Sequence, residues 1–173
     1  RILSFLSSPT PTFMRHLPSD AALFANHRKR LADRLPHGAI AFANANDILP
    51  SNADGTLPLH PNSDLFYLSG IEQEESILLL FPSASNPKHR EILFLRKPNE
   101  QLKIWEGHKH DKEEGATISG IRSIHWVNEF DDIMQQLASE GEIFYFNENE
   151  HSRAGKTVET RDQRFNQKLQ RDY

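Results

Sequence analysis

The sequence predicts an α/β domain in which a mixed sheet is flanked by helices. Three observations support this prediction. Short apolar runs of strand length alternate with amphipathic segments of helix length, two of those runs are separated by turn-forming residues, and a strand, a helix and a strand follow one another later in the chain. The chain has 173 residues, of which 37% are hydrophobic, including eleven Phe. This length and composition suit one domain with a single hydrophobic core.

The first predicted element is a helix that begins after Asp20, a residue type that accepts hydrogen bonds from the first backbone N–H groups of a helix. Apolar side chains recur every three or four positions over residues 23–35, and the Pro-His-Gly sequence at residues 36–38 ends the pattern. A short strand is expected over residues 39–43. Residues 44–63 contain three Pro and one Gly and are therefore expected to form a long loop.

The middle of the chain is expected to contribute three strands. Residues 65–68 have the composition of a strand, and residues 77–81 and 92–95 are apolar runs separated by Pro, Ser and Asn residues. Two such runs joined by turn-forming residues are typical of an antiparallel hairpin. Residues 96–120 are rich in charged side chains, and we expect them to form a loop with no more than one helical turn.

A strand, a helix and a strand are expected near the end of the chain, over residues 123–127, 129–140 and 143–146. The two strands should run parallel, because a helix connects them. Residues 160–173 are predicted to form a last helix, whose few apolar side chains need a neighbour to cover them.

The domain is expected to comprise residues 20–173, preceded by a flexible extension over residues 1–19. The longest apolar run, residues 76–82, is far shorter than the roughly 20 residues that cross a bilayer, so no membrane span is expected. The formal net charge of -4 argues against binding to nucleic acid, which usually requires a basic face. The absence of Cys excludes disulfides, thiolate zinc sites and Cys nucleophiles, and a cytoplasmic location is the default expectation.

The sequence lacks the Gly-rich dinucleotide and phosphate loops, the G-x-S-x-G nucleophile motif and the H-E-x-x-H zinc motif. The strongest local candidate for metal binding contains His108 and His110, whose imidazoles could share an ion with Asp111 or Glu113. The surrounding segment is rich in Lys and Glu, and polar loops often bring such residues together without a ligand. We therefore expect no metal-binding and no catalytic residue in this chain.

Three other groups of polar residues are interpreted as structural. The Arg-Lys-Arg sequence at residues 28–30 could contact an anion or an acidic partner, but a solvated face of the first helix is expected, because no aromatic platform accompanies it. An acidic cluster could supply an acid and a base, but its place before a buried strand indicates a polar turn. Scattered histidines are expected at the surface or in the core. The acidic cluster is Glu72, Glu74 and Glu75, and the histidines are His60, His125 and His151.

The most informative segment is residues 60–71, His-Pro-Asn-Ser-Asp-Leu-Phe-Tyr-Leu-Ser-Gly-Ile. Its Asn, Ser and Asp side chains can bind their own backbone and cap a turn, and Gly70 allows a bend. The segment resembles the signature of the aminopeptidase P N-terminal domain. Phe66 and Tyr67 are expected in the core, and His60 stands where relatives often have Arg.

The resemblance extends over residues 20–150. It includes the first helix and the strand after it, the predicted hairpin, the Ile-Trp-Glu-Gly sequence at residues 104–107 and the helix at residues 129–140. It implies an RNase H-like arrangement and a position before a second, catalytic domain with the pita-bread fold. That domain would hold two divalent ions, commonly manganese, on two Asp, one His and two Glu. None of these ligands can be assigned in this chain.

The resemblance implies that the full-length protein is an Xaa-Pro aminopeptidase, a metallopeptidase that removes the N-terminal residue from peptides with proline in second position. The domain would form a wall of the active-site cleft, contact its own catalytic domain and support a homo-oligomer, either a dimer or a tetramer. Trp105 is the candidate residue for substrate binding, because relatives place an aromatic residue near an active site at this position. A Trp packed within its own domain is the alternative.

Three other functions remain open at this point. A prolidase or a creatinase-like enzyme has the same two-domain plan and differs in the catalytic domain. A free-standing module for binding or oligomerisation would need no peptidase. A small metal hydrolase built on His108 and His110 would need a bound ion, which metal analysis of the purified chain would detect.

Overall fold

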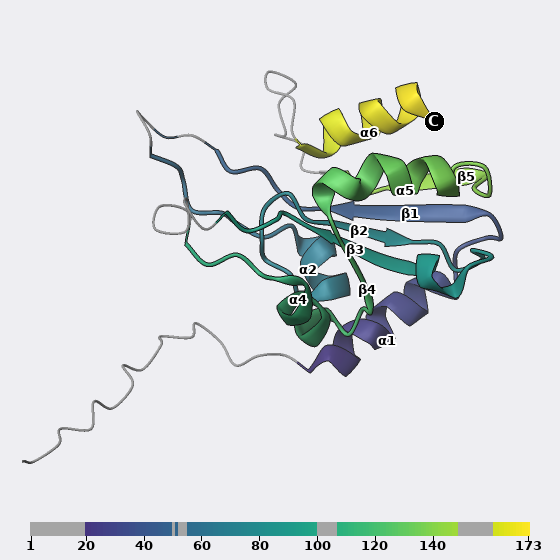
Figure 1. The fold of residues 1–173 in the computed structure, drawn as a ribbon, viewed down its shortest axis with the longest axis horizontal. Coiled ribbons are helices and arrows are strands. Elements are labelled where there is room, and N and C mark those ends of the chain that lie inside the picture. Colours follow the sequence, from purple (N-terminus) through teal and green to yellow (C-terminus); the bar gives the residue numbers. More distant parts are fainter. Residues whose placement is uncertain (1–19, 50, 52–54, 100–106, 149–160) are drawn as a thin grey trace, which may run out of the picture.

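A five-stranded mixed sheet forms the centre of the molecule (Figure 1). The computed structural model describes residues 20–49, 51, 55–99, 107–148 and 161–173. The strands are β1 (Ala39–Asn44), β2 (Ile77–Leu80), β3 (Glu91–Leu95), β4 (Ser123–Trp126) and β5 (Ile143–Phe146). They lie in the order β4-β3-β2-β1-β5. The prediction of an α/β domain with a mixed sheet and flanking helices is confirmed.

The strand pairings include the predicted hairpin. β2 runs antiparallel to both β1 and β3, and η1 (Pro87–His89) lies in the connection between β2 and β3. β4 joins the sheet parallel to β3, and β5 joins it parallel to β1. β4 and β5 therefore run in the same direction, as expected, but they form opposite edges of the sheet and do not pair.

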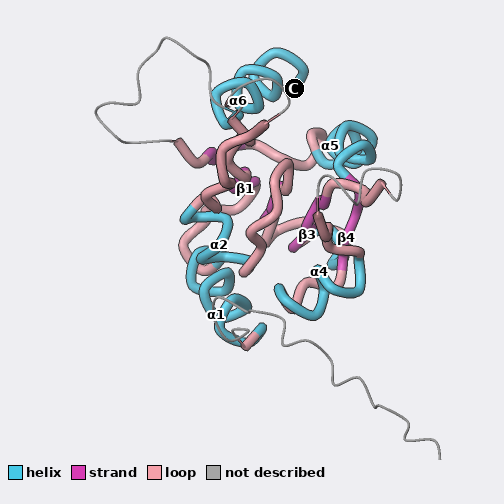
Figure 2. The backbone as a smooth tube through the Cα atoms, turned by 90° about the vertical axis from the view of Figure 1, so that its left-hand side faces the viewer, coloured by secondary structure: helices cyan, strands magenta, loops and turns pink. Residues whose placement is uncertain are grey.

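Helices cover both faces of the sheet, as the two perpendicular views show (Figures 1 and 2). On one face lie α1 (Ala21–Ala32), α2 (Ser63–Ser69) and α4 (Lys112–Ser119). On the other face lie α5 (Phe130–Leu137), which η2 (Val127–Glu129) precedes, and α6 (Arg161–Asp172). The last two helices confirm the predictions made for the corresponding segments of the sequence.

The central strands are apolar on both sides because both faces of the sheet are covered. In β2, Ile77 and Leu79 belong to the hydrophobic cluster that includes α5 and α6, whereas Leu78 and Leu80 belong to the cluster that includes α2. Alternation along a strand thus divides the core into two layers. Phe165 of α6 packs into the first layer, so the sheet and α5 cover the apolar side of this otherwise polar helix.

Residues 65–68, predicted to be a strand, belong instead to α2. The side chain of Asn62 accepts hydrogen bonds from two backbone N–H groups, at 3.0 and 3.1 Å, and so caps the helix. Gly70 ends the helix with a φ of 73°, in the left-handed region. In this helix Phe66 is partly buried and Tyr67 is 48% exposed, so the predicted place of Tyr67 in the core is wrong.

Residues 112–119 form α4, where the sequence predicted a loop with no more than one helical turn. The helix begins with a capping box. Asp111 Oδ1 accepts from the N–H of Glu114 at 2.8 Å, and the Glu114 carboxylate accepts from the N–H of Asp111 at 3.0 Å. Hydrophobic periodicity is a weak signal for such a helix, because eight residues make only about two turns.

Arg28 is buried, which contradicts the prediction of a solvated Arg-Lys-Arg face. Its side chain is 1% exposed, and Nη1 donates to the backbone carbonyls of Leu68 and Ser119, both at 2.9 Å. Nε donates to the Glu91 carboxylate at 3.1 Å. Because the two carbonyls lie in the last turns of α2 and α4, one cation satisfies acceptors at two helix C-termini. The next two residues of the sequence are exposed, as predicted.

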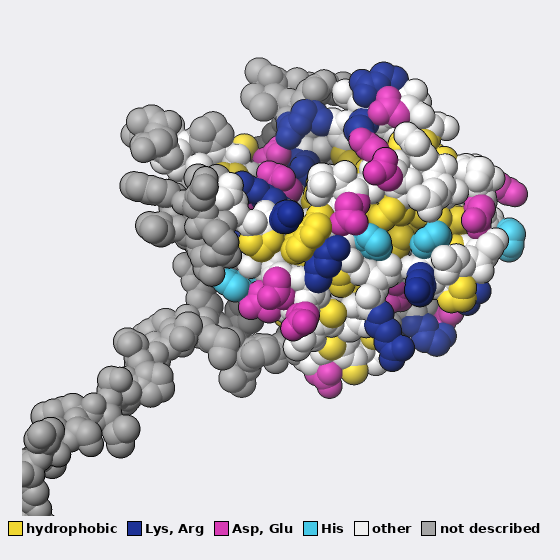
Figure 3. All heavy atoms as spheres, in the orientation of Figure 1, with side chains coloured by type: hydrophobic (Ala, Val, Ile, Leu, Met, Phe, Trp, Pro, Cys, Tyr) yellow, Lys and Arg dark blue, Asp and Glu magenta, His cyan; other side chains and the backbone are white. Residues whose placement is uncertain are grey.

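The surface carries charges of both signs. On the face shown in Figure 3, Lys and Arg side chains are interspersed with Asp and Glu, and hydrophobic side chains lie exposed between them. Within the described ranges, no helix combines the length and the apolar character that a membrane span requires. Residues 1–19, interpreted above as an extension, lie outside the described residues.

Candidate functional site

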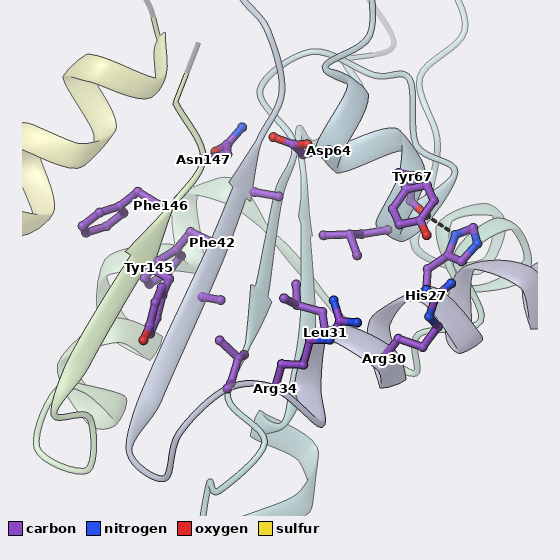
Figure 4. Close-up of a pocket in the computed structure, with 14 residues that line it drawn as sticks. His27, Arg30, Leu31, Arg34, Phe42, Asp64, Tyr67, Tyr145, Phe146 and Asn147 are labelled. Atoms are coloured by element: carbon purple, nitrogen blue, oxygen red, sulfur yellow. Dashed lines mark hydrogen bonds between the residues drawn. The ribbon is translucent and has the colours of Figure 1, made fainter. Parts of the chain in front are cut away.

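A pocket of about 380 Å³ opens between α1, α2, β1 and β5 (Figure 4). Its lining includes Ala41 and Ala43, which alternate along β1 with Phe42 of the opposite layer of the core. Tyr145 pairs with Ala41 in the register between β1 and β5 and therefore lies on the same side of the sheet. The small Ala side chains leave space that the neighbouring helices do not fill, and this space is the pocket.

Charged and aromatic side chains surround the pocket. Arg30 comes from α1 and Arg34 from the turn that follows it, and Asp64 and Tyr67 come from α2 (Figure 4). The ring of His27 stacks on that of Tyr67 with centroids 3.8 Å apart, and His27 Nδ1 donates to the Tyr67 carbonyl at 2.8 Å. Two guanidinium groups beside an apolar floor suit a ligand that carries a carboxylate. The arrangement is therefore a candidate binding site.

A buried carboxylate lies in the turn before β2. The Glu74 side chain is 5% exposed, and its Oε1 lies 2.9 Å from Arg96 Nη1 and 2.5 Å from Lys109 Nζ. Burial by itself raises the pKa of Glu74, but hydrogen bonds from Lys109 and Arg96 outweigh burial and hold this pKa below its usual value of 4.5. The turn thus precedes β2 as expected, and Glu74 anchors the loop that contains Lys109.

Glu74→Gln is expected to lower the free energy of unfolding at neutral pH by about 1–3 kcal/mol, because Lys109 and Arg96 lose a charged acceptor. The pKa of Glu74 is depressed in the folded state. The ionised Glu74 side chain therefore contributes to the free energy of unfolding above pH 4.5, its pKa in the unfolded state. This contribution is lost as the pH falls through the pKa of the folded state. Acidification should therefore reduce the difference in free energy of unfolding between wild type and variant. Urea unfolding at a series of pH values from about 7 to about 3 measures this difference.

The control for this experiment is Glu113→Gln, which neutralises an exposed carboxylate in the first turn of α4. It should leave the free energy of unfolding nearly unchanged across the pH series. A difference between wild type and Glu74→Gln that stays constant down to the lowest pH would contradict the assigned ion cluster.

The histidines singled out in the sequence lie in different surroundings. The backbone carbonyl of His60 accepts from Asn46 Nδ2 at 3.0 Å, and His125 Nδ1 lies 3.5 Å from the Glu129 carboxylate. His151 lies outside the described residues, as does Trp105. The substrate-binding role of Trp105 therefore stays a prediction.

The structure brings His108 and His110 together, and the acid beside them is Glu114. A single carboxylate oxygen of Glu114 lies 2.9 Å from His108 Nε2 and 3.8 Å from His110 Nδ1. The sequence pointed to Asp111 or Glu113 instead, because it did not predict that a helix begins here and turns Glu114 back toward the histidines.

The pocket and its residues Arg30, Arg34 and Tyr145 were not predicted from the sequence. One signal was present: in residues 39–43, Ala-Ile-Ala-Phe-Ala, every second side chain is small, so one face of this strand leaves room for a ligand or a neighbour. Whether the helices leave that face open depends on packing between segments that are distant in the sequence. Hydrophobic periodicity is a local pattern and does not predict such packing.

Comparisons with known sequences identify a family. Residues 24–145 match the family model described as aminopeptidase P, N-terminal domain. The Xaa-Pro aminopeptidase of Escherichia coli (strain K12) is 24% identical over 131 residues, which are 76% of this chain and 30% of that protein. Human Xaa-Pro aminopeptidase 3 is 23% identical over 89 residues, 50% of this chain and 18% of that protein. The chain thus spans less than a third of either relative.

Solved structures share the fold. A Bacillus anthracis protein assigned as an aminopeptidase P matches with a TM-score of 0.79 at 24% identity, over 90% of this chain and 36% of that chain. E. coli aminopeptidase P with the inhibitor Pro-Leu matches with a TM-score of 0.68 at 23% identity, over 80% of this chain and 31% of that chain. A further E. coli structure is of the zinc-substituted enzyme in complex with product.

The sheet order, the two helix layers and these likenesses define the class of protein, an α/β domain of the aminopeptidase P type. The chain belongs to the aminopeptidase P N-terminal domain family, because the family model covers more than half of it. The resemblance seen in the segment at residues 60–71 is thereby confirmed.

Proposed function

We propose that this chain is the N-terminal accessory domain of an Xaa-Pro aminopeptidase, in which residues beyond the chain perform the hydrolysis. The observation that carries the proposal is the family match over residues 24–145, in a chain that spans only 30% of the E. coli Xaa-Pro aminopeptidase. Such an enzyme releases the N-terminal residue from peptides that have proline in second position.

The described residues do not fit the two divalent ions that the family resemblance implies. Two Asp, one His and two Glu would be needed, whereas the group of three possible ligands within the described ranges is His108, His110 and Glu114. No hydrolytic step is therefore assigned to this chain, and the manganese pair belongs to the proposed catalytic domain.

The accessory domain would form a wall of the active-site cleft, restrict access to short peptides and support a homo-oligomer in the cytoplasm. The pocket between α1 and β5 supports a binding role. Arg30 and Arg34 suit a carboxylate, and the Ala41 and Ala43 floor suits an apolar side chain. A short peptide carries both kinds of group.

The test compares this 173-residue chain with the longer protein proposed to contain it. Both are assayed with manganese on Xaa-Pro tripeptides, with Xaa-Ala tripeptides as the control substrate. We expect proline-dependent release of the N-terminal residue by the longer protein and none by the chain alone. Release by the chain alone would overturn the proposal. Cleavage by the longer protein of Xaa-Pro dipeptides only would reassign it to the prolidases.

Trp105→Ala in the longer protein is expected to lower kcat/KM for an Xaa-Pro peptide by roughly ten- to a hundredfold while the melting temperature stays unchanged. The chain after Trp105 is held against the domain, since the N–H of His110 donates to Gln73 Oε1 at 2.6 Å. An indole that contacts the substrate would lose this contact on truncation to Ala, while the core of the domain would stay intact.

Thermal unfolding and kcat/KM, measured on one preparation, check this prediction. Trp126→Phe, a change in a partly buried Trp of β4, is the control for loss of an indole elsewhere. A strongly lowered melting temperature of Trp105→Ala with unchanged activity per folded molecule would place Trp105 in the core.

A further inference from the structure

The segment that leads into α4 holds three side chains with metal-ligating atoms. His108 and His110 precede the helix, and Glu114 lies in its first turn. Nε2 of His108 lies 2.9 Å from Oε2 of Glu114, and Nδ1 of His110 lies 3.8 Å from the same oxygen. One ligating atom from each of the three side chains lies within 4.8 Å of the other two.

These separations are close to those of an occupied metal site. Zinc bonds to nitrogen and oxygen are about 2.0–2.2 Å long, so ligands in tetrahedral geometry lie about 3.3–3.5 Å from one another. The His108 side chain is 59% exposed, and its ring nitrogen contacts Glu114, the carboxylate with which it would share the ion. Because this ring is at the surface, it can adjust its position when an ion binds.

The imidazole of His110 is the second observation that points to a ligand. Its Nδ1 atom is buried and has no hydrogen-bond partner within the part of the chain that the structure describes. A buried ring nitrogen that no neighbouring group occupies is available to bind a metal.

Neighbouring groups fix the orientation of the ligands. The N–H of His110 donates to Gln73 Oε1 at 2.6 Å, and the Glu114 carboxylate accepts from the N–H of Asp111 at 3.0 Å. The capping box thus holds the carboxylate beside the two rings. The Glu114 carboxylate, which lies against both rings, places a negative charge where a cation would bind.

We propose that His108, His110 and Glu114 bind one divalent ion of the late first-row transition metals, with zinc as the expected occupant. Two imidazoles and one carboxylate suit these metals better than Mg²⁺ or Ca²⁺, which prefer oxygen ligands. The ion would replace the proton between His108 and Glu114, and three protein ligands leave a fourth position for water or another ligand. This site goes beyond the proposed peptidase role. It also reverses the expectation from sequence, which had not placed Glu114 beside the histidines.

The test is a zinc titration of the full chain after metals have been removed with a chelator. Calorimetry near neutral pH should show saturable binding at one site, and Co²⁺ should give the visible absorption bands of a tetrahedral site. His108→Ala removes an exposed ring, and Glu114→Gln keeps an oxygen that can accept from the N–H of Asp111, so both variants should fold. Each is expected to weaken zinc binding by at least about tenfold.

Matched controls remove similar groups outside the cluster. Glu113→Gln neutralises an exposed carboxylate on the same turn, and His37→Ala removes an exposed imidazole. Both should bind zinc as the wild type does, and a given zinc concentration should raise the melting temperature of the wild type more than that of Glu114→Gln. The proposal is overturned if the wild-type chain binds no zinc at millimolar concentration, or if His108→Ala and Glu114→Gln bind it as tightly as the wild type.

Discussion

Arg28→Ala is expected to lower the free energy of unfolding by about 3–5 kcal/mol. The guanidinium of Arg28 donates to the carbonyls of Leu68 and Ser119 and to the carboxylate of Glu91. Alanine would leave two buried carbonyls without a donor and a cavity in place of one of the largest fully buried side chains. Denaturant unfolding should report the loss as a lower midpoint at an unchanged slope.

Two neighbouring changes test the cause of this loss. Arg28→Lys should recover only part of the stability, because a single ammonium group lacks the planar fork that reaches both helix ends and Glu91. Lys29 is exposed, and its ion pair with Asp33 contributes no more than about 0.5 kcal/mol, so Lys29→Ala should change little. If Arg28→Ala and Lys29→Ala lower the free energy of unfolding equally, the buried hydrogen bonds of Arg28 do not contribute the stability proposed for them.

Gly70→Ala should lower the free energy of unfolding by about 2–4 kcal/mol, for two separate reasons. The φ of Gly70 is 73°, a left-handed conformation that costs a residue with a Cβ about 1–2 kcal/mol. The added Cβ would also lie 2.4 Å from the ring of Phe24, which is buried and packs edge-on against Phe66. That ring must move. Thermal and denaturant unfolding of the variant measure the sum of the two effects.

Gly120→Ala separates the cost of the left-handed backbone from the cost of the contact with Phe24. Residues 69–71 and 119–121 have the same Ser-Gly-Ile sequence, so the two glycines can be compared directly. In each copy the Ser hydroxyl donates to the carbonyl four residues earlier and accepts from the Ile N–H. Gly120 has a φ of 74°, but the nearest atom to an added Cβ is 3.5 Å away. Its substitution should cost only about 1–2 kcal/mol. Equal losses in the two variants would contradict the contact with Phe24.

The strands of this sheet could be predicted because helices cover both of its faces. Full burial makes each central strand a continuous apolar run, and the turn residues between two such runs indicated the hairpin of β2 and β3. The helices α5 and α6 were predicted from apolar side chains at helical spacing. α5 is no longer than α4, but its buried residues are large apolar side chains, whereas those of α4 are Gly115 and Ser119. The order of the strands could not be predicted, because the pairing of β1 with β5 joins segments that no local pattern relates.

The errors came from short segments and from long-range contacts. Residues 65–68 have strand composition, and four residues are too few for the helical period to show. The helix signals were the caps, Asn62 at the start and Gly70 at the end. For Arg28, charge predicted exposure, but its acceptors lie 40 and 91 positions away in the sequence. Tertiary hydrogen bonds of this kind leave no trace in local composition.

The candidate site was predictable only in part. The sequence showed two histidines two positions apart, but Glu114 contacts them only because α4 begins with a capping box. The pocket needs α1, α2 and β5 to meet over the Ala side chains of β1. The family, by contrast, was visible in residues 60–71, because capping residues and a left-handed Gly are fixed by local backbone geometry.

The pairing of β1 with β5 also sets the timing of folding on the ribosome. Ala39 of β1 lies opposite Ile143 of β5, and at about 5–20 residues per second the intervening chain of about 100 residues takes roughly 5–20 s to synthesise. Throughout that interval one side of β1 has no strand to pair with. Unpaired N–H and C=O groups on an apolar strand can template pairing with another nascent chain. This edge of the sheet therefore stays open to neighbours until β5 emerges and closes it.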